Sequence, residues 1–217
     1  MDTVAVRLAA IDRPNDLSLE QAEWLAQAAK GKALALDLGT GWGNSCAVLS
    51  LCCERVLTFG HDDSWTRHAA PKLKGVDNVE PFIGDLTTVD FRPLVQDASS
   101  VVVFWDAHGF DVAEHVLSHI MPAIAEKEHL VICHDMWAEQ CGSYENKRIW
   151  RGMQSRHENP KGFVTLGIGN VASVVDQALV VLDFCNRNRM PIHATTDFVY
   201  FTMNETTSRH FPRAVFP

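Results

Sequence analysis

Hydrophobic residues recur along the chain in two patterns, as short unbroken runs and as residues spaced three or four apart. Short apolar runs bounded by polar or glycine-containing segments are typical of buried strands, whereas the wider spacing is typical of helices. Five such runs lie at 33–38, 56–59, 79–83, 101–105 and 130–133. Helical patterns, such as the one at 112–124, lie between runs. This alternation predicts an α/β fold, with a parallel sheet covered by helices on both faces.

The first helix and the segment after the first strand carry clear local signals. Ser18 and Gln21 have capping-box spacing, and Gly31 follows the last apolar position, so we expect a helix over about 18–30. The first strand leads into a glycine-rich loop at 37–45. An apolar helix over 46–53 is expected next.

The alternation of apolar runs and helical patterns ends after the fifth run. Residues 136–170 are rich in aromatic, glycine and basic residues and offer one modest helical stretch, so we expect a cap or insert there. A second capping box at 173–176 begins a helical pattern that reaches Cys185, and 198–203 reads as a terminal strand. We therefore expect one domain over 1–217, with a core at 18–135, a cap at 136–170 and a completing segment at 171–217.

Composition and net charge argue against some classes of function and partner. The 217 residues are 47% hydrophobic and carry 19 Lys and Arg against 27 Asp and Glu, a net charge of −8, which fits an ordinary globular protein. An acidic chain without a basic stripe argues against nucleic acid or an anionic membrane as the main partner. No apolar stretch approaches the length of a membrane span, and the first residues lack the features of a secretory signal, so we expect a cytoplasmic protein. The six cysteines show no zinc-site spacing and are expected to be reduced thiols, mostly buried.

The glycine loop is the first candidate site. Gly39, Gly41 and Gly43 follow a predicted parallel strand, where glycines let the backbone approach a ligand closely. A tight strand-to-helix turn without a ligand would give the same spacing, so the pattern alone leaves both interpretations open.

The loop and three later strand ends together resemble the class I S-adenosylmethionine-dependent methyltransferases. The segment 37–45 resembles the first motif of that family, and Asn44 stands where the dinucleotide-binding fingerprint of dehydrogenases has its third glycine. The resemblance implies a ribose contact at the end of the second strand, where Gly60 stands in place of the usual acidic residue and Asp62 is the nearest substitute. It also implies an adenine contact at 84–86, through Asp85. As a whole it implies cofactor contacts at Asp37, Gly39, Thr40, Gly41, Asn44, Ser45, Gly60, His61, Asp62, Asp85, Leu86, Asp106 and Ala107.

Polar elements follow the fourth and fifth strands: an Asp-x-His element at 106–108 and a His-Asp element at 134–135. They resemble the branch of the family that includes macrocin-type and sugar O-methyltransferases and cephalosporin-hydroxylase-like proteins. Neighbouring strands would bring Asp106, His134 and Asp135 together, where they could hold a divalent ion such as Mg²⁺. His108 or His134 is then the candidate base for a substrate hydroxyl. Structural roles for the two histidines and the two aspartates are the alternative.

These observations lead to one function hypothesis and two rivals. The resemblance implies a Rossmann-like, doubly wound, mostly parallel seven-stranded sheet with a cap after strand five. It implies an S-adenosylmethionine-dependent O-methyltransferase, assisted by a divalent metal, that acts on a hydroxylated small molecule such as a sugar or secondary metabolite. A homo-oligomer is compatible with it. The first rival is a cofactor-binding homologue with lost or different chemistry that acts as a partner of another enzyme, and the second is an NAD-dependent oxidoreductase.

Overall fold

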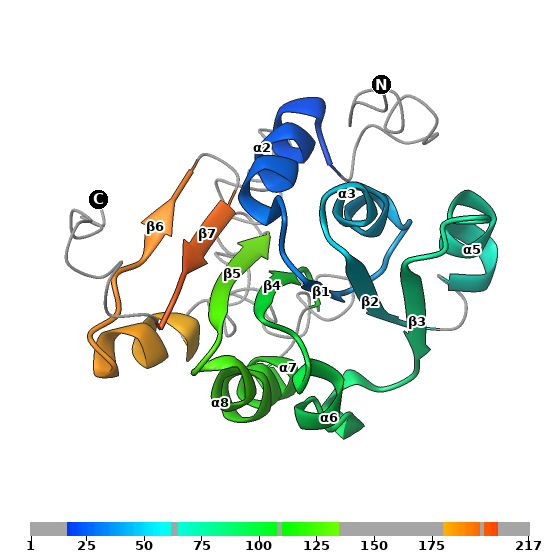
Figure 1. The fold of residues 1–217 in the computed structure, drawn as a ribbon. Helices are drawn as coiled ribbons and strands as arrows, with labels where there is room; N and C mark the ends of the chain where they lie inside the picture. Colours follow the sequence, from blue (N-terminus) through cyan, green and yellow to red (C-terminus); the bar gives the residue numbers. More distant parts are fainter. Residues whose placement is uncertain (1–16, 62–64, 108–109, 135–179, 196–197, 204–217) are drawn as a thin grey trace, which may run out of the picture. The chain divides into compact units, whose positions relative to one another are not determined.

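The computed structural model describes residues 17–61, 65–107, 110–134, 180–195 and 198–203. Within them the fold is α/β, and the strands follow the order β3-β2-β1-β4-β5-β7-β6 (Figure 1). Their bounds are β1 (Leu34–Leu38), β2 (Arg55–Gly60), β3 (Val79–Ile83), β4 (Ser100–Trp105), β5 (Glu128–His134), β6 (His193–Ala194) and β7 (Phe198–Phe201). All the runs predicted as strands between residues 33 and 133, and the terminal strand, are strands in the structure.

The chain divides into two compact units, which we describe separately. The first comprises Met1–Asp106 and Ala123–Val131, and the second comprises Ala107–Pro122 and Ile132–Pro217. The prediction of a single domain with a core, a cap and a completing segment stays a prediction. The predicted cap at 136–170 lies outside the described residues.

The first unit holds the parallel part of the sheet. β1 pairs in parallel with β2 on one side and with β4 on the other, and β2 pairs in parallel with β3. The pairing sets Leu38 opposite both Phe59 and Trp105, so the strands end level with one another. Every residue of β1 and β4 is buried, as expected for central strands of a parallel sheet. The chain order reverses between β1 and β4, which is where ligands bind in doubly wound sheets.

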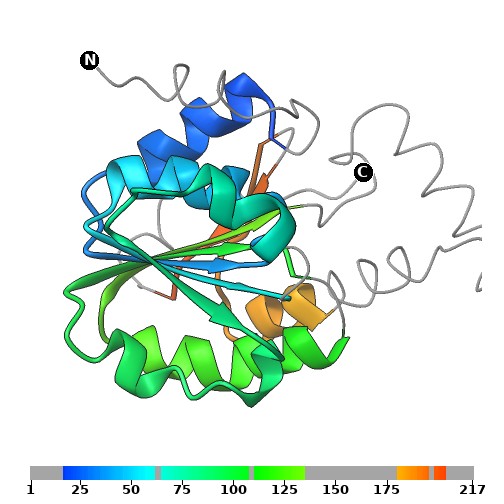
Figure 2. The same ribbon diagram turned by 90° about the vertical axis from the view of Figure 1, so that its right-hand side faces the viewer.

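Helices cover both faces of this sheet, as predicted. In the first unit α2 (Leu19–Ala29), α3 (Asn44–Cys52) and α5 (Ala70–Lys72) lie on one face, and α6 (Arg92–Val95) lies on the other (Figure 2). The predicted capping box of α2 is present, because Ser18 and Gln21 bond each other reciprocally at 3.1 and 2.7 Å. Short helical turns at Trp65–Ala69 and Leu86–Thr88 follow β2 and β3.

The predicted helical pattern at 112–124 is divided in the structure. It comprises α7 (Phe110–His115), a π-helical turn over Val116–Ile120 and α8 (Met121–Ile124). Pro122 has no N–H to donate to the preceding turn, which explains why regular α-helical bonding does not continue across this segment. In the second unit, residues 180–187 are helical, in agreement with the spacing that reaches Cys185, and β6 pairs antiparallel with β7.

Two details of the prediction are wrong. The helix after the glycine loop begins at Asn44 rather than at Cys46, because Gly43 is its N-cap with a left-handed φ of 83°. The fifth strand begins at Glu128 rather than at the predicted residue 130, and its second residue, His129, is buried with 6% exposure. Its Nδ1 lies 2.9 Å from the carbonyl oxygen of Lys127.

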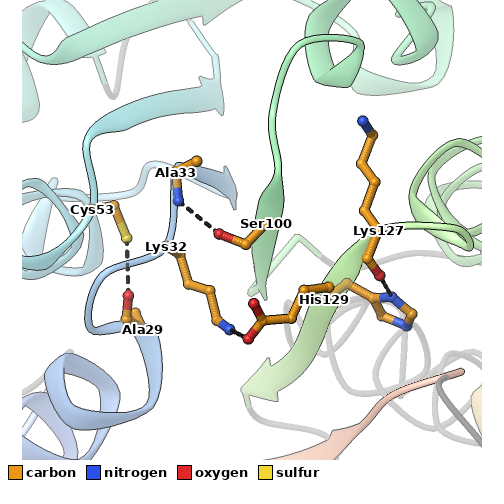
Figure 3. A network of polar contacts seen from close by, with 8 residues as sticks. Ala29, Lys32, Ala33, Cys53, Ser100, Lys127 and His129 are labelled. Atoms are coloured by element: carbon orange, nitrogen blue, oxygen red, sulfur yellow. Dashed lines mark hydrogen bonds and ion pairs between the residues drawn. The ribbon is translucent and has the colours of Figure 1, made fainter.

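Polar contacts connect the amino-terminal ends of the strands of the first unit (Figure 3). The Lys32 ammonium pairs with Glu128 at the start of β5, and the Ser100 hydroxyl at the start of β4 accepts from the N–H of Ala33 at 3.0 Å. These contacts join the beginnings of β1, β4 and β5, and they lie at the edge where the strands begin, away from the glycine loop.

None of the helices in the described part of the chain is long and apolar enough to cross a membrane.

Candidate functional site

The carboxyl ends of β1, β2, β3 and β4 form a continuous edge in the first unit. Backbone hydrogen bonds continue past the strands there, from Gly39 N and Thr40 N to Phe59 O (both 2.9 Å), from Gly84 N to Gly60 O (3.0 Å) and from Asp106 N to Leu38 O (2.8 Å). The segments that the sequence assigns to a cofactor after these four strands are therefore brought together. The residues carried by this edge are the basis of the candidate site.

The glycine loop has a backbone that side chains would disfavour. Gly39, Gly41 and Gly43 have φ angles of 108°, 48° and 83°, all in the region that favours glycine. A Cβ on Gly43 would lie 3.0 Å from the Cβ of Ala69, so this glycine also allows the loop to pack on the turn after β2. A Cβ on Gly41 would meet only the Gly39 carbonyl oxygen, at 3.9 Å. The loop is thus closed toward the protein at Gly43 and open at the exposed Gly41.

A chain of buried side chains supports the loop from below. The Ser45 hydroxyl donates to Asp37 Oδ1 at 2.7 Å, and the Thr58 hydroxyl donates to Asp37 Oδ2 at 2.6 Å. The hydroxyl oxygens of Thr40 and Thr58 are 2.6 Å apart. Because the single hydroxyl proton of Thr58 goes to Asp37, Thr40 is the donor to Thr58. The chain therefore connects β1, β2, the glycine loop and the first turn of α3.

Burial changes the acidity of Asp37. Its pKa is raised from 3.8 to about 7, chiefly because the fully buried carboxyl loses its hydration. The hydrogen bonds from Thr58 and Ser45 lower the pKa, and the charge of Asp106 raises it further. Burial also raises the pKa of the Cys46 thiol on α3, to which the charge of Asp37 adds. The Asp37 carboxyl therefore lies on β1 beneath the loop, with its pKa near neutral.

An aromatic and cationic stack lies beside the loop. The rings of Trp42 and His68 are stacked, with their centroids 3.6 Å apart, and Lys72 Nζ lies 5.3 Å from the centroid of the Trp42 ring. His68 and Lys72 come from the helical segment after β2. The stack fixes the side chain between the second and third glycines of the loop.

The residues that follow β2 and β3 offer different groups to a ligand. Gly60 offers backbone alone, and the next side chain, His61, is exposed. Asp85 is exposed, and its Oδ1 accepts from the N–H of Thr87 at 2.9 Å and from the Thr87 hydroxyl at 2.7 Å. Asp85 therefore begins the short turn that contains the buried Leu86. Asp62, the nearest acidic residue to the expected ribose position, lies outside the described residues.

The predicted metal and base residues are only partly described. Asp106 is half-buried at the end of β4 in the first unit, whereas Ala107 and His134 belong to the second unit. His134 is 6% exposed, and its ring is tilted against that of Phe198, with a centroid distance of 5.5 Å. His108 and Asp135 lie outside the described residues. Among the residues that the structure describes, no group of three His, Cys, Asp or Glu side chains could hold a metal ion.

Thr58 is a site residue that the sequence analysis missed. It lies in the middle of the apolar run of β2 and is completely buried. A hydroxyl residue inside an otherwise apolar strand is a signal for a buried partner, because a buried polar group is costly unless it is hydrogen-bonded. That signal was present, but it does not show which residue the partner is.

Comparison with known proteins places the fold. No protein-family model matches the chain, and no curated protein matches it at a significant level. Among solved structures it is similar to the O-methyltransferase TomG from Streptomyces achromogenes, involved in tomaymycin synthesis and crystallised with S-adenosylmethionine. The TM-score is 0.52 at 16% identity, over 92% of this chain and 86% of TomG.

Two further structures agree. The methyltransferase PaMTH1 from Podospora anserina, bound to S-adenosylhomocysteine, has a TM-score of 0.55 at 12% identity, over 92% of this chain and 85% of PaMTH1. A methyltransferase from Geobacter sulfurreducens has a TM-score of 0.51 at 16% identity, over 93% of this chain and 90% of that one. The chain thus shares a Rossmann-like α/β fold with these solved methyltransferases.

Proposed function

We propose that the protein is an S-adenosylmethionine-dependent O-methyltransferase that acts on a hydroxyl of a small molecule, such as a sugar or secondary metabolite. The observation that carries the proposal is the glycine loop, which is open at Gly41 and lies at the carboxyl edge of the sheet, where the strand order reverses. Ligands of doubly wound sheets bind at that place. Solved structures of similar fold contain S-adenosylmethionine or S-adenosylhomocysteine.

The described residues fit such a cofactor. Gly39 and Gly41 let the backbone approach it, and α3 begins at Asn44 and Ser45, where the positive end of the helix dipole favours a carboxylate. Gly60, His61 and Asp62 are the proposed neighbours of the ribose. Asp85 and Leu86 are proposed at the adenine, and Asp106 and Ala107 complete the contacts.

The chemistry asked of the chain is modest. The bound cofactor supplies an electrophilic methyl group on a positively charged sulfur. The protein has to hold the acceptor hydroxyl in line with that group and remove its proton, and positioning alone contributes much of the acceleration. An imidazole is suited to accept the proton near neutral pH, so His108 and His134 are the proposed bases. The proposed cap at 136–170 would select the acceptor.

Binding of a divalent metal ion is a separate part of the proposal. Asp106, His134 and Asp135 have the oxygen and nitrogen donors that a divalent ion accepts. The described residues do not form a metal site by themselves, since no three-ligand group occurs among them. We therefore assign no step to a metal and propose Mg²⁺ binding only as a feature to be tested.

Calorimetry with S-adenosylhomocysteine tests the cofactor first. The wild type should bind it and should not bind NAD. Gly41→Ala should weaken binding, because its methyl group would project from the open face of the loop. Gly75→Ala is the matched control, since Gly75 also has a positive φ, of 81°, and open space around it, but lies in the turn before β3. Absence of S-adenosylhomocysteine binding at millimolar concentration would refute the proposed function.

Methyl transfer to a panel of hydroxylated compounds then tests the reaction, with Mg²⁺ and with a chelator. The wild type and Asp135→Ala are compared, with Asp77→Ala, an exposed residue before β3, as the control. Loss of transfer with chelator and in Asp135→Ala supports the metal. Equal activity in all conditions removes the metal from the proposal, and cofactor binding without transfer to any acceptor favours a binding homologue.

A further inference from the structure

Gly60, the last residue of β2, has no room for a side chain. A Cβ at this position would lie 2.7 Å from Thr40 Oγ1 and 2.9 Å from Thr40 Cβ. Contacts under 3.0 Å are essentially never made by a real Cβ, so something would have to move. Gly60 is not among the residues with positive φ, so its backbone does not itself require glycine. The glycine is needed for space, and the space is filled by Thr40.

Thr40 cannot easily give way. The position of its Cβ is set by the backbone, whose N–H donates to the carbonyl oxygen of Phe59 at 2.9 Å. Its hydroxyl is held by Thr58, which is held by Asp37, and all three residues are at least 98% buried. A rotation of Thr40 that moved the hydroxyl away would leave Thr58 without its buried donor and would leave the Cβ contact unchanged.

Gly60 is held equally firmly. It pairs with Ile83 of β3 in the parallel ladder, and its carbonyl oxygen accepts from the N–H of Gly84 at 3.0 Å. A shift of Gly60 away from Thr40 would therefore disturb the end of β3 as well. Neither residue can relieve the contact alone at low cost.

We propose that Thr40 and Gly60 are a matched pair that fixes the glycine loop against the end of β2, and that binding of the nucleoside part of the cofactor depends on the pair rather than on either residue alone. Thr40 is then a positioning residue of the site. The inference rests on the proposed function for the identity of the ligand. It also gives a physical reason for the glycine at position 60, where an acidic residue was expected.

A double-mutant cycle tests the pair. The four proteins are the wild type, Gly60→Ala, Thr40→Gly and the double variant Thr40→Gly/Gly60→Ala, in which the Cβ is moved from one residue to the other. The affinity for S-adenosylhomocysteine is measured by calorimetry at a temperature where circular dichroism shows all four folded. Adjacent residues that interact couple by about twofold to a hundredfold in an equilibrium constant.

The expected result is specific to the pair. Gly60→Ala should weaken binding by about tenfold or more, and the double variant should bind more tightly than Gly60→Ala alone, although it lacks two wild-type residues. Thr40→Ser keeps the Cβ and the hydroxyl and should bind nearly as the wild type does. Gly75→Ala, which adds a methyl group in open space, should lose stability without losing affinity.

Two results would overturn the inference: wild-type affinity in Gly60→Ala, or a double variant that binds no better than Gly60→Ala. If the wild type itself does not bind S-adenosylhomocysteine, the proposed function fails. The steric pair is then judged by urea unfolding of the same four proteins. Independent, additive losses of stability would refute the pair, and recovery in the double variant would retain it as a fixed contact of the loop.

Discussion

The hydroxyl of Thr58 on β2 donates a 2.6 Å hydrogen bond to the carboxyl of Asp37 on β1, inside the sheet and without contact with solvent. Among the described residues, Ser45 and Cys46 on α3, Thr58 on β2 and Asp106 at the end of β4 interact with this carboxyl. The bond therefore couples the charge of one buried acid to the conformation of the candidate cofactor loop.

Asp37 should make stability fall as the pH rises from about 4 to about 7. Below 3.8 its carboxyl is protonated in both states. Between 3.8 and about 7 the unfolded chain ionises while the folded one keeps its proton, and above about 7 the loss is complete. At about 1.4 kcal/mol per pKa unit, the total is about 4 kcal/mol.

Urea unfolding of the wild type and Asp37→Asn across this pH range measures the effect. The difference between the two proteins cancels the other titrating groups, and it should shift in favour of Asp37→Asn by several kcal/mol between pH 4 and pH 8. A difference that does not change with pH would show that Asp37 is already ionised throughout.

Removing a donor to Asp37 should cost more at high pH than at low pH. Ser45→Ala leaves a buried carboxyl oxygen without its hydroxyl, at a cost of about 1–3 kcal/mol, and more when the carboxyl is charged. Ser50→Ala is the matched control on the same helix, because the Ser50 hydroxyl donates to the Ala47 carbonyl oxygen at 2.8 Å. Its cost, measured by urea unfolding at pH 5 and pH 8, should be small and equal. Equal costs for Ser45→Ala at the two pH values would contradict the coupling.

The sequence predicts the architecture well, because buried strands appear in it directly as apolar runs. The run at 33–38 becomes β1 within one residue, since the central strands of a parallel sheet are apolar on both faces. The start of β5 was set two residues late, because Glu128 and His129 interrupt the apolar pattern. In the structure Glu128 is paired with Lys32, and His129 is bonded to the backbone, so both are tolerated at the strand's beginning.

The candidate site is predicted in outline but not in its supporting contacts. Glycine spacing identifies the loop, since it reports a backbone requirement. The contact between Thr40 and Gly60 joins residues twenty positions apart, and only the register of β1 with β2 brings them together. The N-cap at Gly43 is also hard to predict from the sequence, because Gly43 caps α3 through its positive φ and has no side chain that would mark it as a cap.

Cys52 should be the first of the described cysteines to react with iodoacetamide. It is half-buried at the end of α3, and its side-chain interaction with the neighbouring Cys53 lowers its pKa. The pKa values of Cys46, Cys53, Cys133 and Cys185 are raised, chiefly by burial, and in Cys53 first by its bond to Cys52. Since the thiolate is the reacting form, brief alkylation followed by peptide mass mapping should label Cys52 ahead of these four. Cys53→Ala should slow the labelling, whereas Cys53→Ser, which keeps a donor, should slow it less; labelling of Cys46 first would contradict the assignment.

Trp42 should hold the loop through the stack with His68. Trp42→Leu loses the ring contact and the cation contact with Lys72, together about 1–2 kcal/mol, whereas Trp42→Phe keeps a ring in place. Because the side chain lies between Gly41 and Gly43, Trp42→Leu should weaken S-adenosylhomocysteine binding, measured by calorimetry, as well as stability. Trp24→Leu on α2 is the control, and it should lower stability while leaving affinity unchanged. If both leucine variants lose stability equally and neither loses affinity, the stack supports the fold and has no part in positioning the loop.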